Sequence, residues 1–105
     1  MDGDGVPRIA RLSGPELARA RQVAVHSPLP SGAGTLTWTI TVMTVDKIPL
    51  AESLVTSPDF PIPLSEIVQP HLDVVGLVAA GSWEPQATPD GSPRFNAAVR
   101  VRPGR

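Results

Sequence analysis

The clearest pattern in the chain is a strict alternation of apolar and polar residues in its second quarter. From Thr35 to Val42 every even position is large and apolar, and every odd position is threonine. The apolar row consists of Leu36, Trp38, Ile40 and Val42. A period of two over this length is typical of an antiparallel strand with one face in the core and the other in solvent. We predict such a strand from Thr35 to about Val45, with its threonines on the exposed face.

A hairpin is predicted near the C-terminus. Residues Leu72–Trp83 are apolar at both parities, which favours a central strand covered on both faces. The sequence Thr88-Pro89-Asp90-Gly91 fits a type I turn. The next segment alternates again, and its apolar face is made by Phe95, Ala97, Val99 and Val101. We therefore predict that Val74–Glu84 pairs antiparallel with Phe95–Arg102.

The first third of the chain carries the signal of a helix start. Ser13 and Glu16 have the spacing of a capping box, in which each side chain bonds to the backbone of the other residue. The apolar stripe after this start consists of Leu17, Ala20 and Ala24. Because Pro28 ends a helix, we predict that this one runs from Ser13 to Val25 or His26.

Prolines and glycines divide much of the remaining chain. Val6–Leu12 alternates weakly and is predicted as a short strand, and Pro28–Gly34 is predicted as a loop. The five prolines between positions 49 and 70 predict that this stretch is broken into short pieces. Within it, Leu50–Val55 fits a helical turn or a short strand, and Leu64–Gln69 fits a short helix entered through a proline.

Length and composition limit the fold to one small domain. The chain has 105 residues, so we predict a single domain over 1–105, with a loose lead-in at residues 1–5. With 41% hydrophobic but only 4% aromatic residues, the core is built mainly from aliphatic side chains. The predicted class is α+β: an antiparallel sheet of three to five strands, or a partly open barrel, with an N-terminal helix and a short second helix. The absence of cysteine excludes disulfides, thiolate metal sites and a cysteine nucleophile.

The net charge of −1 conceals an uneven distribution of charges. Residues 1–22 sum to +1, residues 23–91 to −6 and residues 92–105 to +4, which add to −1. The arginine-rich C-terminal strand either binds an anion or neutralises the acidic middle segment. Eight arginines against one lysine, with abundant Ala, Gly, Pro and Val, fit a bacterial GC-rich coding bias and are not counted as a sign of nucleic-acid binding.

No targeting or membrane segment is predicted. The N-terminus is acidic and lacks the basic and apolar regions of a signal peptide. The longest apolar run, Val74–Ala80, is too short to span a bilayer. We therefore expect a cytoplasmic or particle-bound protein that does not interact with membranes.

The histidines offer one candidate for acid/base chemistry. His71 and Asp73 are two residues apart, which places both on the same face of a strand as a base and its orienting carboxylate. The alternative is that His71 lies at the exit of a short helix, where the helix dipole favours a cation. No ligand spacing supports a metal site, and no cofactor is predicted.

One segment resembles part of a known family. Gly76, the turn Thr88–Gly91 and the strand Phe95–Val99 are similar to the turn and following strand of bacterial single-stranded-DNA-binding OB domains. The similarity covers under a third of the chain, differs in the spacing from the turn glycine to Phe95, and falls at the other end of the chain. It implies a nucleic-acid surface in which an aromatic side chain stacks among basic residues. The candidates for that surface are Trp83, Arg94, Arg100 and Arg102.

These features favour a non-catalytic binding or assembly module over an enzyme. The chain shows no convergent set of nucleophile, base and oxyanion donors. A small core, a strand that is apolar on both faces and a threonine-rich sheet surface predict burial against a second copy or a larger protein particle. Two alternatives stay open: the OB-like nucleic-acid-binding protein, and a small enzyme with an apolar barrel pocket lined by Trp38, Ile40 and Leu77.

Overall fold

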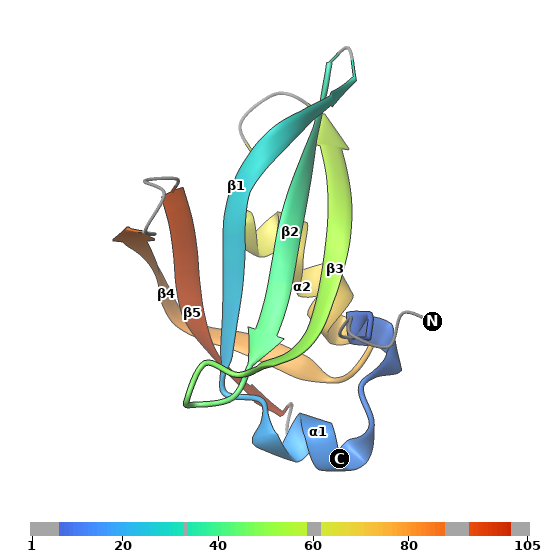
Figure 1. Ribbon diagram of the computed structural model, residues 1–105, viewed down its shortest axis with the longest axis vertical. Helices are drawn as coiled ribbons and strands as arrows, with labels where there is room; N and C mark the ends of the chain where they lie inside the picture. Colours follow the sequence, from blue (N-terminus) through green and yellow to red (C-terminus); the bar gives the residue numbers. More distant parts are fainter. Residues whose placement is uncertain (1–6, 33, 59–61, 88–92, 102–105) are drawn as a thin grey trace.

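Three long antiparallel strands form the first part of the sheet (Figure 1). The computed structural model describes residues 7–32, 34–58, 62–87 and 93–101. Strand β1 (Gln22–Gly32) pairs with β2 (Thr35–Met43), and β2 pairs with β3 (Pro49–Pro58). The strand predicted from the threonine alternation is confirmed as β2, and it ends at Met43 rather than Val45.

The C-terminal hairpin completes the sheet. Strands β4 (Leu77–Ala87) and β5 (Pro93–Val101) pair antiparallel, which confirms the predicted hairpin, although its first strand starts three residues later than expected. Strand β5 lies beside β1, so the order across the sheet is β3-β2-β1-β5-β4, with β3 and β4 at its two edges. The predicted turn Thr88–Gly91, residue Arg102 and the lead-in of residues 1–5 lie outside the described residues.

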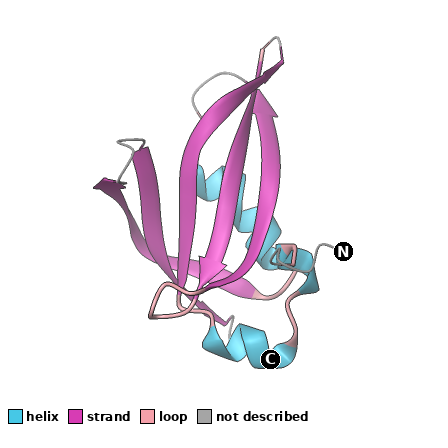
Figure 2. Cartoon of the chain, viewed as in Figure 1, coloured by secondary structure: helices cyan, strands magenta, loops and turns pink. Residues whose placement is uncertain are grey.

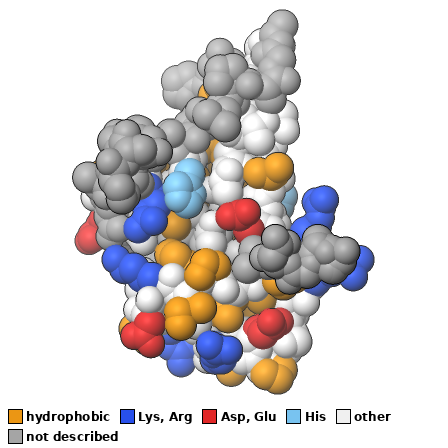
Figure 3. Space-filling model, viewed as in Figure 1, with side chains coloured by type: hydrophobic (Ala, Val, Ile, Leu, Met, Phe, Trp, Pro, Cys, Tyr) orange, Lys and Arg blue, Asp and Glu red, His pale blue; other side chains and the backbone are white. Residues whose placement is uncertain are grey.

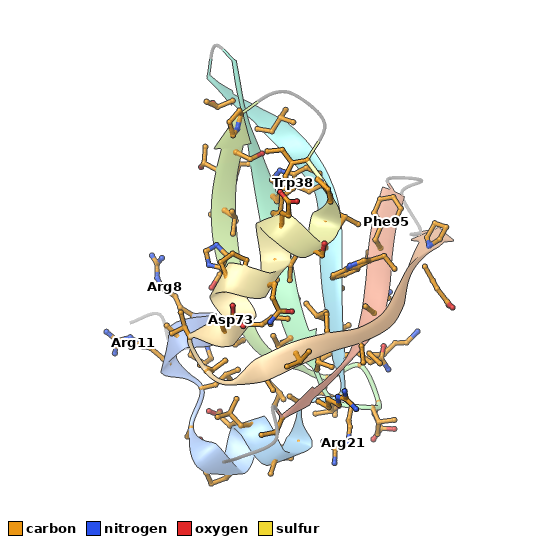
Figure 4. The ribbon with its side chains drawn as sticks, turned by 180° about the vertical axis from the view of Figure 1, so that it is seen from behind. Arg8, Arg11, Arg21, Trp38, Asp73 and Phe95 are labelled. Atoms are coloured by element: carbon orange, nitrogen blue, oxygen red, sulfur yellow. The ribbon has the colours of Figure 1, made fainter. Side chains whose placement is uncertain are left out.

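The five-stranded sheet curls into a half-barrel around one helix. Helix α2 (Leu64–Asp73) lies behind β1, β2 and β3 in Figure 1 and in front of them in Figure 4, so it covers one face of the sheet, the inner face. Helix α1 (Gly14–Arg19) lies at one end of the sheet (Figure 2), preceded by the short 3-10 helix η1 (Ile9–Arg11). This arrangement confirms the predicted α+β class. In the described part of the chain, neither helix has the length and apolar character needed to cross a membrane.

The core lies between the inner face of the sheet and α2. Alternate residues of β1, β2 and β5 point inward, among them Val25, Ile40 and Val99. Helix α2 contributes Ile67, Val68 and Leu72 to the same cluster. Full burial of such aliphatic side chains contributes about 1.5–3 kcal/mol each, so the packing of α2 is a main source of stability. As predicted, Trp38 and Phe95 belong to the inward row; Trp38 packs against the core near the N-terminal end of α2 (Figure 4).

Helix α2 also covers the backbone edge of β4. The Gln69 amide nitrogen donates to the carbonyl oxygen of Leu77 (3.0 Å), and the Ala79 N–H donates to the Gln69 amide oxygen (3.3 Å). The same amide nitrogen donates to Asp73 Oδ1 (2.8 Å). Gln69 thus takes the place of a neighbouring strand at this edge, where unpaired backbone groups would otherwise be open to another chain.

Helix α1 is much shorter than predicted. It starts after Ser13 as expected but ends at Arg19, and β1 begins at Gln22. Alternation over 22–26 fits a strand as well as a helical stripe, and the ladders to β2 and β5 on either side decide in favour of the strand. The predicted loop Pro28–Gly34 is also wrong, because β1 continues to Gly32. The pairing of β1 with β2 shifts register near Pro28 and Pro30, and such irregularities accommodate prolines, which have no backbone N–H to donate.

Other boundaries also differ from the predictions. Val6–Leu12 is not a strand, since η1 occupies Ile9–Arg11. Residues 49–58 form one strand rather than short pieces, because its prolines stand at the two ends of β3. The second helix continues through Pro70 to Asp73, so Leu72 belongs to α2. The apolar segment after it is the edge strand β4 rather than a central strand, and the cover supplied by α2 explains its apolar pattern.

The Ser13–Glu16 pair predicts a pH-dependent contribution to stability. Glu16 Oε1 accepts hydrogen bonds from the Ser13 N–H and hydroxyl, both at 3.0 Å, and these bonds lower the pKa of the Glu16 carboxyl. Because the pKa is lowered in the folded protein, the stabilisation is present above the ordinary glutamate pKa and is lost as the pH falls through the lowered value. We expect Glu16→Gln to lower the urea midpoint slightly at neutral pH and to match the parent protein in acid. A difference that stays constant with pH would contradict this assignment.

The bridge from α2 to β4 can be tested by removing the Gln69 amide. Gln69→Leu keeps the size of the side chain but leaves the Leu77 carbonyl and the Ala79 N–H without this partner. We expect the free energy of unfolding, measured in urea, to fall by about 1–3 kcal/mol. The control is Ser65→Ala, an exposed position of the same helix, which should change stability by less than about 0.5 kcal/mol. Equal effects of the two substitutions would show that Gln69 does not seal the edge.

Candidate binding surfaces

The two hairpins of the sheet separate from each other at a fork. Strand β1 pairs with β5 only from Gln22 to His26, and the last pair is His26 with Arg94. Beyond it, β1 continues with β2, while the start of β5 remains with β4 (Figure 1). Register shifts accompany the separation, after His26 in β1 and between Ala80 and Glu84 in β4. Bulges of this kind bend strands and often lie beside functional sites.

Polar side chains gather on the outer face of the sheet at this fork. The register places Thr39, His26 and Arg94 in one row across β2, β1 and β5. The adjacent row contains Thr41 and Asn96, with Ala24 between them. We call the five polar residues of these rows, His26, Thr39, Thr41, Arg94 and Asn96, the fork site.

The floor of the fork site is buried although no helix covers it. Asn96 is only 6% exposed, Thr41 is also buried, and Ala24 between them has no exposed surface. The threonine row of β2, predicted to face solvent, is therefore buried at Thr41, and Thr35, Thr37 and Thr39 are half-buried. Ala24, Thr41 and Asn96 therefore form a buried patch on the outer face of the sheet.

Several polar atoms of the fork site lack hydrogen-bond partners. Both the nitrogen and the oxygen of the Asn96 amide are buried and unpaired, and so is His26 Nδ1. Buried polar groups in folded proteins are almost always paired, and each unpaired one costs about 1–3 kcal/mol. The three atoms come from neighbouring positions of β1 and β5.

The charges around the fork site have both signs. Arg94, within the site, is half-buried. Glu52 flanks the opposite end, where its Oε2 accepts a hydrogen bond from Thr41 Oγ1 (3.2 Å). Glu84 of β4 lies opposite Asn96 in the register of β4 with β5. Figure 3 shows the outer face, on which basic, acidic and hydrophobic side chains are interspersed. The site is therefore polar without a strong excess of either charge.

A second candidate surface is the free edge of β3. The N-terminal segment covers the lower part of this edge: the Glu52 N–H donates to the Pro7 carbonyl oxygen (2.9 Å), and the Ile9 N–H donates to Ser53 Oγ (3.1 Å). Because alternate residues of a strand direct their backbone groups to the same side, those of Leu54 and Thr56 also point away from β2. No described residue pairs with these outward groups.

Exposed side chains accompany the free part of the β3 edge. Leu54 is 65% exposed, and Thr56 is exposed beside it. A hollow of about 170 Å³, lined by Arg8, Glu52, Ser53 and Leu54, lies where the N-terminal segment leaves the strand. Arg8 itself points away from the body of the molecule (Figure 4). The free stretch is therefore an uncharged strand edge with an accessible leucine. Two charged residues, Arg8 and Glu52, lie at its lower end, where the N-terminal segment covers the strand.

The predicted nucleic-acid residues do not share one face of the sheet. Trp83 is half-buried and packs against the core, on the inner side. Arg94 and the exposed Arg100 occupy outer-face positions of β5, as the register with β1 and β4 shows. Arg102 lies outside the described residues. The structure thus separates the aromatic side chain from the arginines among which it was predicted to stack.

The predicted acid/base pair rests on a strand that the structure does not contain. His71 and Asp73 both lie in α2, where residues two apart do not face each other. Asp73 Oδ1 instead accepts the hydrogen bond from Gln69. Within the described residues, no three histidine, aspartate or glutamate side chains approach one another in a metal-binding arrangement.

The predicted apolar pocket coincides with the packed core. Ile40 and Leu77 have no exposed surface, and Trp38 packs against the same cluster. Ile67 and Val68 of α2 belong to this cluster. Helix side chains therefore fill the space in which an apolar substrate was predicted to bind.

The sequence predictions missed His26, Asn96 and Leu54 as surface residues of interest. His26 was assigned to a helix end, and Leu54 to a helical turn or short strand. The available signal was Asn96, because asparagine is depleted in strands and stands here within an alternating segment. The contacts that make these residues notable depend on strand pairing, which the sequence alone does not specify. Comparison of the chain with family models, curated proteins and solved structures found no match.

The unpaired amide of Asn96 predicts an unusual stability effect. Asn96→Leu has nearly the same size and removes two buried polar atoms that lack partners. We expect the free energy of unfolding to rise by about 1–3 kcal/mol. Thr41→Val is the matched control, because the Thr41 hydroxyl donates to Glu52, and its removal should cost about 0.5–1.5 kcal/mol. Destabilisation by both substitutions in urea would contradict the assignment of an unpaired amide.

Proposed function

We propose that the protein is a non-catalytic assembly module that associates with a second copy of itself through the β3 edge. The observation that carries this proposal is the contrast between covered and open edges. Pro7 covers β3 at Glu52, and Gln69 covers β4 at Leu77 and Ala79, whereas the outward groups of Leu54 and Thr56 have no described partner. An open, uncharged edge is a template for pairing with another strand.

The free part of β3 is complementary to itself. If two copies meet antiparallel about a two-fold axis at Val55, Leu54 of one copy lies opposite Thr56 of the other. Both residues direct their N–H and C=O outward, so the pair can exchange hydrogen bonds in the manner of an antiparallel ladder. Residues 53–57 carry no charged side chain, so the contact brings no like charges together within this segment. A two-fold contact of this kind is isologous and closes at the dimer.

The side chains at this edge add apolar contact to the backbone pairing. The exposed Leu54 leaves solvent against Thr56 of the other copy, on the outer face of the joined sheet. Cross-strand pairs of this type contribute about 0.2–1 kcal/mol each. Since Pro7 limits the contact at Glu52, the interface is short, and we expect association that depends strongly on protein concentration.

The test measures molar mass by light scattering over a range of concentrations. Thr56→Pro removes one outward N–H without affecting the ladder to β2, and Leu54→Lys places a charge at the edge. We expect the parent protein to form dimers as concentration rises, and both variants to remain monomeric with unchanged circular dichroism. Glu66→Lys, an exposed change on α2, is the control and should dimerise like the parent.

Two outcomes would contradict the proposal. One is a parent protein that stays monomeric at every concentration. The other is a dimer that survives both edge substitutions, which would assign assembly to a different surface.

A further inference from the structure

We infer that a hollow between the end of α1 and the connection from β2 to β3 binds a small zwitterion, an α-amino acid with an aliphatic side chain. The hollow has a volume of about 260 Å³. It is lined by Ala18, Arg19, Arg21, Thr44, Val45, Asp46 and Ile48. It lies at the Pro49 end of β3, whereas the proposed dimer uses Leu54 and Thr56, so the inference is independent of the proposed function.

Two segments of the chain line this hollow, and they differ in charge. The end of α1 and the residues that follow it contribute Arg19 and Arg21. The connection between β2 and β3 contributes Asp46 together with Val45 and Ile48. All five side chains are exposed, and Figure 4 shows Arg21 beside this connection. The hollow therefore has a positive side and a side that is negative and apolar.

The Arg21 guanidinium is held in place by backbone groups at the end of α1. Its Nη1 donates to the carbonyl oxygens of Ala18 (2.9 Å) and Ala20 (2.8 Å). A guanidinium has five N–H donors in a planar fork, so the donors on Nε and Nη2 remain for a ligand. Two parallel hydrogen bonds from such an edge match the two oxygens of a carboxylate. Arg19 adds a second positive charge to the same side.

The connection between β2 and β3 is ordered by its own hydrogen bonds. Thr44 Oγ1 accepts from the backbone N–H groups of Asp46 (3.2 Å) and Ile48 (3.1 Å). The Gln22 side-chain amide donates to the Val45 carbonyl oxygen (3.3 Å), which ties the connection to β1. Because both sides of the hollow are held in this way, a ligand finds the site formed and orders little of the chain when it binds.

The charges and the apolar side chains select the class of ligand. The hydrogen bonds of the Arg21 guanidinium go to backbone carbonyls rather than to Asp46, so a carboxylate can meet the arginine and an ammonium can meet the aspartate. An α-amino acid carries both groups on one carbon. Val45 is 67% exposed and Ile48 is 52% exposed, so an aliphatic side chain of the ligand removes apolar surface from water. Pockets for drug-sized molecules have volumes of about 300–1,000 Å³, and this smaller hollow suits a single amino acid.

A simple anion is the main alternative occupant, because two arginines attract any negative charge. Such an anion makes no use of Asp46 or of the apolar residues. Analogues of leucine that each lack one feature therefore distinguish the two occupants. Isocaproate lacks the ammonium, isoamylamine lacks the carboxylate, and glycine lacks the side chain.

The experiment titrates the full chain with L-leucine at neutral pH and follows the backbone amide signals of Asp46 and Ile48 by nitrogen-15 NMR. We expect a saturable shift with leucine. Isocaproate and isoamylamine should each bind about ten-fold more weakly, because each loses one charge-assisted contact. Glycine should also bind more weakly than leucine, since it covers no apolar surface. Acetate is the probe for a simple anion and should bind more weakly than leucine.

Two variants assign the charged contacts. Asp46→Asn keeps the size of the side chain and should weaken leucine binding about ten-fold without affecting isocaproate, so that the two ligands bind alike. The double substitution Arg19→Gln with Arg21→Gln should make leucine and isoamylamine bind alike. Such a selective loss is not expected from a variant that is merely less stable. Arg8→Gln with Arg11→Gln removes two exposed arginines elsewhere and is the matched control, which should bind leucine like the parent.

Any of three results overturns the inference. The first is the absence of a saturable shift with leucine. The second is equal binding of leucine, isocaproate and acetate by the parent protein, which would show a site for simple anions only. The third is a preference for leucine that survives both in Asp46→Asn and in the double arginine variant, which would place the ligand elsewhere.

Discussion

The packing of α2 into the concave face of the sheet is the constraint on which the rest of the structure depends. A sheet of five strands that does not close into a barrel needs cover for one face and for its edges, and α2 supplies part of both. Leu72 and its neighbours fill the inner face, while the Gln69 amide pairs with the backbone of β4. Because the helix occupies the interior, surfaces for binding are left on the outer face and at the remaining edge.

Those two surfaces arise from departures from regular pairing. Bulges in β1 and β4 separate the hairpins and leave Asn96 and His26 buried without partners. The N-terminal segment covers β3 only as far as Glu52, so the edge beyond it is open. Each feature costs stability or solubility in an isolated chain, and functional sites are where proteins tolerate such costs. The threonines of β2 connect the two surfaces, since Thr39 and Thr41 of the fork site lie opposite Leu54 and Glu52 of β3.

Local patterns predicted the elements whose signals have one physical meaning. Alternate threonines identified β2, and the hairpin of β4 and β5 followed from the alternation after its turn. Valine and alanine alternation at 22–26 fits a helix and a strand alike, so the end of α1 depended on strands distant in the sequence. The fork site could not be predicted, because His26 and Asn96 become neighbours only through the register of β1 with β5. The prolines of β3 led to the wrong prediction that this stretch is broken into short pieces. A proline inside a strand interrupts it, whereas Pro49 and Pro58 stand at the two ends of β3.

The measurement that tests the assembly account most directly is hydrogen exchange of the backbone amides of β3 at low and high protein concentration. The Glu52 N–H, bonded to Pro7 within the chain, serves as the internal reference and should be protected at both concentrations. If β3 edges pair between copies, the amides of Leu54 and Thr56 exchange freely in dilute solution and become protected as the concentration rises. Rapid exchange of these two amides at every concentration would contradict the account.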